Sequence, residues 1–412
     1  MKNLETGLIA SCCASKVQDA GEFARGIRVK ITQAVFGAFH HFELGRELDS
    51  RGHLDRIYST WPWTRLKREG LPRNKVETFP WVHTPVTVLE RAGLLPRRLS
   101  DDLGVWNAKA FDDWTCKRIP ECDALVAIAG AALKTGKLVQ RRGGKFCCDS
   151  GSSHPRFQGQ IVREEYSRWG VNLPANDLRD TVREEEIFAV ADAITVASSF
   201  AAHTYLEAGI APDKLNVIPL GVRLESFAKT TEQAADCFNV MFAGSISLRK
   251  GVPYLLQAFA ELRHPKKRLR LAGHVDESAK QVLGRLPLND VEFLGVLAPQ
   301  DLAQTMSSSH VLVLPSIEDG FGMVMAQAMA CGCPVICSTN TGGPDLLTEG
   351  IEGFVVPIRD PGAIAIRLQE LAENPEQQRT MGEAAQRRVQ VLGGWSDYGD
   401  RWETLLQKLA ST

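Results

Sequence analysis

Short runs of Val, Ile and Leu alternate with amphipathic segments along most of the chain. Strands that alternate with helical patterns are typical of βαβ units, which build parallel sheets. The first half is therefore predicted to form a doubly wound, Rossmann-like α/β domain. Its expected strands lie at residues 28–35, 54–60, 75–79, 124–129, 144–149, 193–198 and 214–220.

The second half repeats this style and predicts a second domain of the same kind. Pro219 and Gly221 interrupt the chain between the two halves, so we place the boundary there. The last helix carries Trp395, Tyr398 and Trp402 at helical spacing, a stripe that we interpret as packing across the boundary. The predicted domains are residues 1–220 with 394–412, and residues 221–393. The expected strands of the second domain lie at residues 238–244, 267–273, 291–295, 310–315, 334–338 and 353–357.

Composition narrows the class of protein. The 412 residues are 44% hydrophobic and 24% charged, with a net charge of −1. Such a balance does not favour nucleic acid as a partner, since binding to phosphates needs excess positive charge. No apolar run approaches the ~20 residues of a membrane-spanning helix. The N-terminus loosely resembles a lipoprotein signal at Cys12, but Glu5 and a short apolar core argue against it. We expect a cytoplasmic protein.

Cysteines and paired acids give no support for a metal site. None of the ten cysteines forms two matched Cys-x-x-Cys pairs, so free, mostly buried thiols are expected. The acidic pairs Asp101-Asp102 and Asp112-Asp113 fall in helical or loop segments rather than at strand ends. We therefore expect no metal and no cofactor.

The segment SIEDGFGMVMAQAMACGCPVICS, residues 316–338, carries the strongest candidate site. It places a glycine-rich loop between a strand and a helix, at the sheet edge where parallel α/β domains bind ligands. Gly320 and Gly322 allow a ligand to approach the backbone. Asp319 and, eight residues later, Gln327 can hydrogen-bond hydroxyl groups. The alternative is a helix start that Asp319 caps.

A second loop opens the same half in FAGSISLRKGVPYLLQAF. Gly244 ends a strand, and Arg249 and Lys250 stand just before Gly251 and a helix. Two cations there would offset the charge of a departing diphosphate. The alternative is a solvated surface pair, but both loops belong to the carboxyl edge of one predicted sheet, and together they favour a diphosphate site.

Three histidines of the first half follow predicted strands. His154 lies in CCDSGSSHP, and we expect it to face the cleft between the two predicted domains. His40 and His41, in GAFHHF, also lie at a strand's carboxyl edge, where either a structural or a site role is open.

The second half resembles the nucleotide-sugar-binding domain of the family four glycosyltransferases. These enzymes have the two-domain GT-B fold with a C-terminal crossover helix, and they transfer sugars with retention of configuration. Most of residues 185–405 show the resemblance, which is weaker before residue 185. The matching motifs are the loop 244–251, FLG (293–295), PSIEDGFG (315–322), AMACGCPVI (328–336), Gly342-Gly343 and GxxGFVV (350–356), with VADAITVASSF and VIPLGV in the first half.

The resemblance assigns roles to individual residues. Lys250 would bind the donor diphosphate, Asp319 would contact the transferred sugar, and Gln327 would hold the ribose. The main chain at Leu297 would touch the base, and His154 would orient the sugar. Asp319 and Gln327 replace the family's two glutamates, and Ser245 replaces its usual arginine, whose charge Arg249 could supply. The loop residues Gly244, Ser245, Gly320, Phe321 and Gly322 complete the expected donor site.

The implied activity is transfer of a hexosyl or N-acetylhexosaminyl group from a nucleoside-diphosphate sugar to a saccharide, lipid-linked or other hydroxyl acceptor. Glycan or polysaccharide biosynthesis is the implied context. Arginines 91, 97 and 98 and the basic segment 134–145 leave open a peripheral contact with the inner face of the membrane. A nucleotide-sugar epimerase on the same fold and a non-catalytic nucleotide-sugar binder remain alternatives. A phosphorylase of the glycogen type is disfavoured, because nothing singles out a lysine for pyridoxal phosphate.

Overall fold

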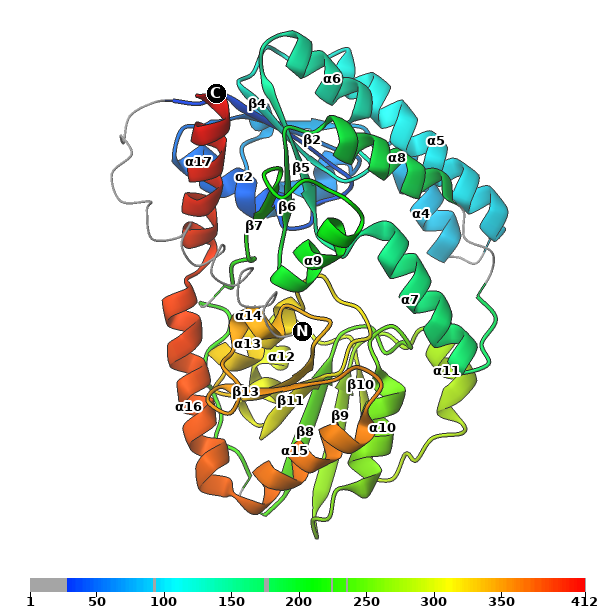
Figure 1. Ribbon diagram of the computed structural model, residues 1–412, viewed down its shortest axis with the longest axis vertical. Helices are drawn as coiled ribbons and strands as arrows, with labels where there is room; N and C mark the ends of the chain where they lie inside the picture. Colours follow the sequence, from blue (N-terminus) through cyan, green and yellow to red (C-terminus); the bar gives the residue numbers. More distant parts are fainter. Residues whose placement is uncertain (1–27, 92–93, 174–177, 224, 235, 412) are drawn as a thin grey trace, which may run out of the picture.

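The computed structural model describes residues 28–91, 94–173, 178–223, 225–234 and 236–411. Two parallel sheets, each flanked by helices, lie one above the other along the long axis of the molecule (Figure 1). Each predicted strand is present, with ends that differ by a few residues. The predicted fold, two Rossmann-like domains facing each other, is confirmed. The exact boundary at residues 220 and 221 stays a prediction.

The first sheet has seven strands in the order β3-β2-β1-β4-β5-β6-β7. Its strands are β1 (Ile31–Val35), β2 (Leu54–Ser59), β3 (Val76–Thr78), β4 (Ala124–Ile128), β5 (Lys145–Ser150), β6 (Ala193–Val196) and β7 (Leu215–Val217). Its helices are α2 (His41–Ser50), α3 (Trp63–Leu66), α4 (His83–Arg91), α5 (Arg97–Cys116), α6 (Leu133–Arg141), α7 (Pro155–Arg168), α8 (Leu178–Val190) and α9 (Ser199–Glu207), with short 3₁₀ turns at Lys67–Glu69 and Arg73–Lys75.

The second sheet has six strands in the order β10-β9-β8-β11-β12-β13. Its strands are β8 (Phe238–Ala243), β9 (Lys267–Ala272), β10 (Val291–Gly295), β11 (Val311–Leu314), β12 (Val335–Ser338) and β13 (Gly353–Val356). The helices that follow β8 in the chain are α10 (Val252–Glu261), α11 (Glu277–Leu283), α12 (Pro299–Ser307), α13 (Met323–Ala330), α14 (Gly343–Leu346), α15 (Pro361–Glu373), α16 (Pro375–Leu392) and α17 (Trp395–Ala410).

Strand order reverses once in each sheet, between β1 and β4 in the first and between β8 and β11 in the second. In open parallel sheets, the loops that leave two such strands diverge to opposite faces, and the crevice between them is the usual ligand site. The two candidate loops of the second half follow β8 and β11. His40 and His41 follow β1.

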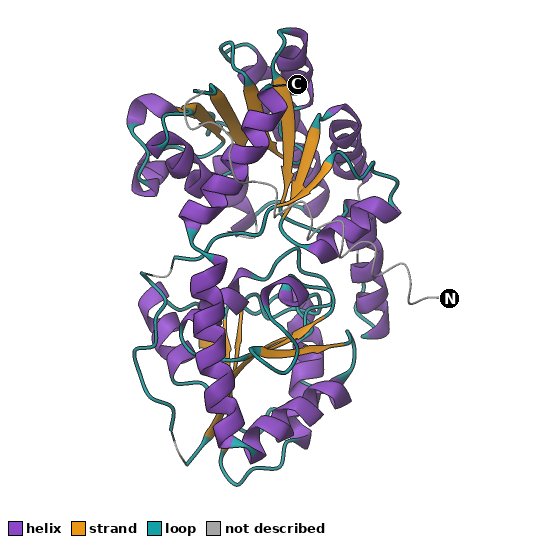
Figure 2. Ribbon diagram, turned by 60° about the vertical axis from the view of Figure 1, so that its left-hand side comes forward, coloured by secondary structure: helices purple, strands orange, loops and turns teal. Residues whose placement is uncertain are grey.

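The final helix packs the end of the chain against the first domain. α16 lies beside the second sheet and α17 beside the first, against α2 (Figures 1 and 2). Tyr398, Trp402 and Leu406 are fully or almost fully buried in the core that this face of the first sheet forms. The predicted role of the aromatic stripe in packing is therefore confirmed.

Several smaller predictions can be checked in the described part of the chain. Its cysteines are free, and those on β5, on β12 and after α13 are buried. Both acidic pairs lie on α5. Asp112 is buried and accepts hydrogen bonds from the backbone N–H groups of Lys134 and Thr135, so it caps α6.

Cys12, the residue of the loose lipoprotein resemblance, lies outside the described residues. No described helix has both the length and the apolar character needed to cross a membrane.

Candidate active site

The loops after β8 and β11 pack directly on each other. Gly251, the residue before α10, has a φ of +68°, and a β-carbon there would lie 1.9 Å from the carbonyl oxygen of Pro315. Only glycine tolerates both this conformation and this approach. The glycine before the helix therefore brings Arg249 and Lys250 against the segment 315–322.

Each cation of the first loop pairs with an acid of the second. The Lys250 ammonium group contacts the Asp319 carboxylate, and both side chains are largely buried. The Arg249 guanidinium group lies 3.1 Å from a carboxylate oxygen of Glu318 and donates to its main-chain carbonyl at 3.0 Å. The sequence predicted that these two loops meet, and the structure brings Arg249, Lys250 and Asp319 together.

Glu318 is a residue whose role the sequence reasoning missed. Its side chain is fully buried, and besides Arg249 it binds Ser153 and Gln158 of the first domain. A buried carboxylate is stable only when donors surround it, and here the donors come from both domains. The sequence signal for this role was the adjacent pair Glu318-Asp319: neighbouring side chains point in different directions, so only one of the two could face a ligand.

Gly320 brings the two domains into contact. Its carbonyl accepts a 2.6 Å hydrogen bond from Ser198, and a β-carbon on it would lie 2.2 Å from the carbonyl oxygen of Gly151. The loop 319–322 therefore rests on the loop after β5 and on the start of α9. This explains why glycine is needed at position 320: the close neighbour is the other domain's backbone.

Asp319 does not cap the following helix. α13 begins after Gly322, which has a φ of +79°, and no side chain caps it. Asp319 is held instead by its backbone N–H, which donates to Asn340, and by Lys250. The alternative interpretation of Asp319 as a helix cap is therefore wrong.

Gln327 projects from the second turn of α13 and is half-buried. Its amide has no hydrogen-bond partner among the described residues. A ligand in the crevice between β8 and β11 would find both a donor and an acceptor there.

The other residues that the sequence predicts to bind the nucleotide-sugar donor lie at the same edge of the second sheet. Gly244 and Ser245 are exposed after β8, Phe321 is buried in the core, and Leu297 is half-buried after β10. The contacts that these residues would make with a donor stay predictions.

His154 is placed differently from the expectation. It is 3% exposed, its Nδ1 atom accepts a hydrogen bond from the Arg156 N–H at the start of α7, and its ring packs against Phe188 and Tyr205. Burial lowers the pKa of His154. The side chain caps a helix and fills the core, so this placement does not support contact with a sugar. A position directly after a strand did not predict the direction of this side chain, because the chain turns at the start of α7 and directs the ring into the core.

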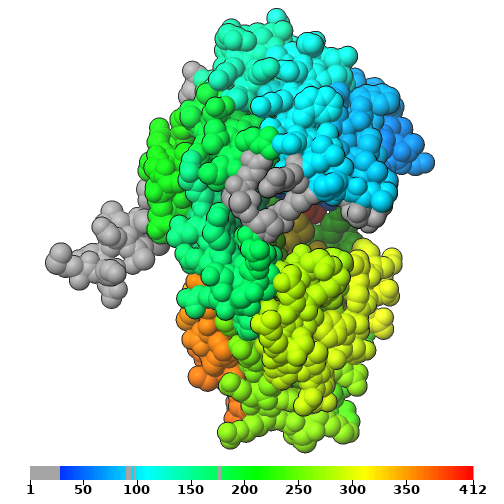
Figure 3. Space-filling view, turned by 90° about the vertical axis from the view of Figure 1, so that its right-hand side faces the viewer, coloured from blue at the N-terminus to red at the C-terminus, as the bar shows by residue number. Residues whose placement is uncertain are grey.

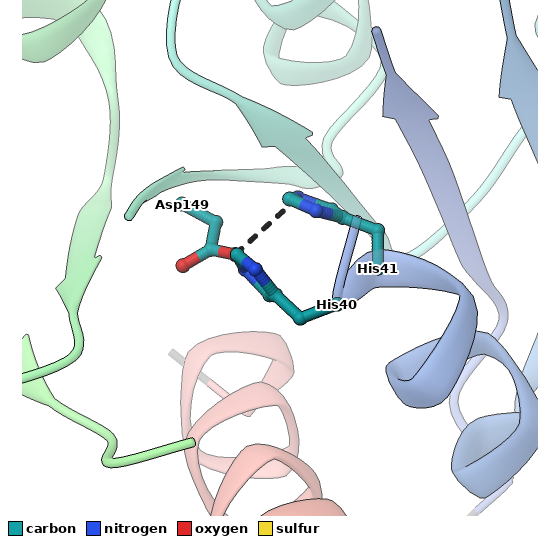
Figure 4. A group of neighbouring side chains, drawn as sticks. All are labelled: His40, His41 and Asp149. Atoms are coloured by element: carbon teal, nitrogen blue, oxygen red, sulfur yellow. Dashed lines mark hydrogen bonds and ion pairs between the residues drawn. The ribbon is translucent and has the colours of Figure 1, made fainter. Parts of the chain in front are cut away.

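His40 and His41, by contrast, meet Asp149 at the end of β5 (Figure 4). One carboxylate oxygen of Asp149 lies 2.6 Å from Nε2 of His40 and 3.3 Å from Nε2 of His41, and the other accepts from Thr195 at 2.7 Å. Burial, together with the neighbouring His40, lowers the pKa of His41 to about 3. Burial would raise the pKa of Asp149, but the histidines and Thr195 outweigh it and the pKa is lowered.

The surface between the domains is hollowed beside the second domain, where yellow-green residues face the first domain (Figure 3). The carboxyl edges of both sheets face this region (Figure 1). Two Rossmann-like domains, each with one reversal of strand order and with their carboxyl edges facing each other, define the class: this is the GT-B fold of glycosyltransferases.

Similarity to known proteins agrees with this class. Residues 226–388 match the family described as "Glycosyl transferases group 1" and form a domain of that kind. The D-inositol 3-phosphate glycosyltransferase of Kribbella flavida is 30% identical over 233 residues, which are 51% of this chain and 55% of that protein. The first few curated relatives are matched over about half to two thirds of their length.

Solved structures are similar over nearly the whole chain. Sucrose-phosphate synthase from Thermosynechococcus elongatus has a TM-score of 0.69 at 20% identity, with 93% of this chain and 99% of that chain covered. HepE from Anabaena, solved in complex with UDP, has a TM-score of 0.66 at 17% identity, with 92% and 100% covered. At these identities the likeness concerns the fold.

Proposed function

We propose that the protein is a retaining, metal-independent glycosyltransferase of family four. It would transfer a hexosyl or N-acetylhexosaminyl group from a nucleoside-diphosphate sugar to a hydroxyl group of a saccharide, a lipid-linked saccharide or a related acceptor. The observation that carries this proposal is the pairing of Arg249 and Lys250 with the acidic loop at the switch point of the second sheet. HepE, of the same fold, has also been solved with UDP-glucose, which supports a nucleotide sugar as the donor class.

The proposed donor site uses the second domain. The diphosphate would lie beside Arg249 and Lys250, whose charges offset the negative charge that develops as the diphosphate leaves. Lys250 would then exchange its contact with Asp319 for the phosphate, which frees the Asp319 carboxylate for hydroxyl groups of the sugar. Gln327, whose amide has no partner within the described part of the chain, would bind the ribose.

The proposed reaction forms the new bond on the face that the leaving group vacates. The bond between the anomeric carbon and the diphosphate oxygen breaks, and the diphosphate keeps the electron pair. The acceptor oxygen bonds to the same carbon, and its proton passes to an oxygen of the departing diphosphate. Configuration is therefore retained, and no separate carboxylate base is needed.

Incubation with a panel of UDP-, GDP- and ADP-sugars tests the proposal. We expect release of the nucleoside diphosphate from one donor class, faster with a saccharide acceptor present, and NMR of the product should show the donor's anomeric configuration. A nucleotide that binds but is never released would identify the chain as a non-catalytic binder. Interconversion of one nucleotide sugar into another would identify it as an epimerase, the function that the histidines near Asp149 keep open.

We further propose that the first domain contacts the inner face of an anionic membrane. Large apolar side chains on and beside α4 and α5 are exposed, with Trp81 at 76% and Leu94 at 70%. Of the basic residues in 134–145, Lys134, Lys137 and Arg141 lie on α6, which packs against α5. The side chains of the arginines at 91, 97 and 98 lie outside the described ones. Apolar and basic side chains together favour anionic lipid surfaces. The other residues of the apolar group are Val88, Leu89, Leu99 and Trp106.

Cosedimentation with phosphatidylglycerol vesicles tests this contact. The protein should sediment with these vesicles and not with phosphatidylcholine alone. Trp81→Ser should weaken the sedimentation, while Val391→Ser, at an equally exposed position in the second domain, should not. Equal sedimentation of the two variants would remove α4 and α5 from the proposed contact.

A further inference from the structure

The first sheet has a switch point of its own, between the ends of β1 and β4, which is where open parallel sheets form a ligand crevice. The proposed donor site, on which this inference rests, is built from side chains of the second domain, so the crevice of the first domain is left for the acceptor. Phe39 and His40 form the turn that leaves β1 towards this crevice.

The turn after β1 is held in an unusual conformation. Phe39 has a φ of +38°, in the left-handed region that a bulky residue rarely occupies, and its side chain is 66% exposed. Such strain persists only where surrounding contacts hold it, and it concentrates at binding sites. Gly37 supplies one such contact through its N–H, which donates to Thr60. His40 supplies the other through Asp149.

The contact between His40 and Asp149 orients the imidazole ring. The distance of 2.6 Å between Nε2 and the carboxylate identifies Nε2 as the protonated nitrogen. Nδ1 therefore remains for another partner, and in the neutral ring it accepts a hydrogen bond. No described residue contacts Nδ1 through a hydrogen bond, and the His40 side chain is 10% exposed while His41 is fully buried.

His40 also lies close to the proposed donor loop. The loop after β5 separates the two: Gly151 approaches the His40 ring on one side and Gly320 on the other, where a β-carbon on either glycine would contact the neighbour. The loop after β5 therefore contacts both His40 and the segment that carries Asp319.

A metal ion does not fit the three side chains as they stand. Nε2 of His40 and the carboxylate oxygen are at hydrogen-bond distance, closer than two ligands on one tetrahedral zinc ion. The Nδ1 atom of His41 has no hydrogen-bond partner among the described residues, whereas metal-bound histidines donate from their second nitrogen. The arrangement is that of a carboxylate that positions a histidine.

We propose that Phe39 and His40 form the acceptor subsite for a neutral polyol ring, with Asp149 as a positioning residue. The exposed aromatic face of Phe39 would cover the apolar face of the ring, and Nδ1 of His40 would accept a hydrogen bond from one of its hydroxyl groups. The recognised group would be a hydroxyl rather than a phosphate, because the buried carboxylate of Asp149 lies directly behind the ring and would repel an anion.

Two substitutions at position 40 separate this role from a structural one. His40→Gln places an amide near the position of Nε2, so it keeps the contact with Asp149 and loses Nδ1. His40→Asn places an acceptor near Nδ1 and loses the contact with Asp149. If His40 binds a hydroxyl group, His40→Gln is the more damaging change for acceptor binding. If His40 only supports the fold, His40→Asn is the more damaging one, and thermal unfolding reports it.

The assay uses myo-inositol, D-glucose, D-mannose and N-acetyl-D-glucosamine as acceptor probes, with the nucleotide sugar that the protein hydrolyses. His40→Gln and Phe39→Ala should each raise the KM for the accepted probe about tenfold, the loss of roughly one neutral hydrogen bond or contact, with the donor KM unchanged. Asp149→Asn should raise the acceptor KM in the same direction. His203→Ala, at an exposed histidine on α9, is the matched control and should change neither constant.

Several results would overturn the inference. An unchanged acceptor KM in His40→Gln, acceptance of none of the four polyols, or a fall in kcat alone would each remove the subsite, the last because it would identify a proton-transfer group. Calorimetric binding of Zn²⁺ that His41→Ala abolishes would make the cluster a metal site instead. Nucleotide release in the absence of any acceptor tests the proposed function separately, so failure of the two ideas can be told apart.

Discussion

The Ser153 hydroxyl group of the first domain donates a 2.8 Å hydrogen bond to the fully buried carboxylate of Glu318 in the second domain. The backbone N–H of Ser153, the amide of Gln158 and the guanidinium group of Arg249 contact the same carboxylate. One buried charge therefore joins the two domains and also holds a cation of the proposed diphosphate site. The contact between the domains and the proposed donor site therefore share this group.

Glu318→Ala should destabilise the protein, because it removes the acceptor of several buried donors. We expect a loss of about 2 kcal/mol in the free energy of unfolding, less than for a fully enclosed pair since Arg249 is 36% exposed. The donor KM should rise as Arg249 loses its anchor. Urea unfolding and donor kinetics measure the two effects. Glu277→Ala, which removes an exposed ion pair with Lys280, is the control, and an equal loss there would contradict the bridging role.

Lys250→Ala should abolish turnover with little effect on folding. The diphosphate would leave without its charge partner, which costs roughly 10²–10³-fold or more in kcat. The loss of the largely buried contact with Asp319 should cost about 1–2 kcal/mol of stability, less than for a fully enclosed pair because both side chains keep some exposure. Nucleotide release and thermal unfolding, with Lys280→Ala as the surface control, give the comparison. Unchanged turnover would remove Lys250 from the diphosphate site.

Gln327→Glu should keep or improve donor affinity, because a carboxylate can accept hydrogen bonds from both ribose hydroxyl groups. Glutamate has the same shape as glutamine, and the change breaks no existing contact, since the half-buried amide has no hydrogen-bond partner among the described residues. Calorimetry with the nucleoside diphosphate measures the change, with Gln304→Glu on α12 as a control. A large loss of affinity would show that the amide donates to a different group.

Glu184→Gln should stabilise the protein above neutral pH. Burial, with repulsion from Asp180 and Glu185, raises the pKa of Glu184 to about 7. Between its usual value of 4.5 and about 7 the unfolded chain releases a proton that the folded protein keeps, so stability falls as pH rises through this window. The glutamine of the variant does not titrate, so Glu184→Gln removes this decrease in stability.

Urea unfolding at pH 5 and pH 8 measures this effect. We expect Glu184→Gln to gain about 1–2 kcal/mol at pH 8 relative to pH 5, reduced from the full shift because the side chain is only partly buried. Glu186→Gln, an exposed position on the same helix, should show no such difference. A parallel pH profile for the two variants would mean that Glu184 is ionised in the folded protein at neutral pH.

The sequence by itself determined where the strands lie along the chain and where the second domain's candidate site would be. Its apolar runs are short and bounded by glycine, proline or polar residues, so each could be recognised locally, and parallel sheets follow from their alternation with helices. Arg249, Lys250 and Asp319 were found because they sit in loops next to strand ends, and all parallel strands end at the same edge.

Only the tertiary structure decided which side chains face the region between the domains. His154 and His40 look alike in sequence, each after a strand and before a helix, yet His154 turns into an aromatic core while His40 is held by Asp149 from a strand more than a hundred residues away. Glu318 and Gly320 acquire their roles from the other domain's backbone and side chains. Local patterns predict elements because their causes are local, whereas burial and long-range hydrogen bonds depend on how the elements meet.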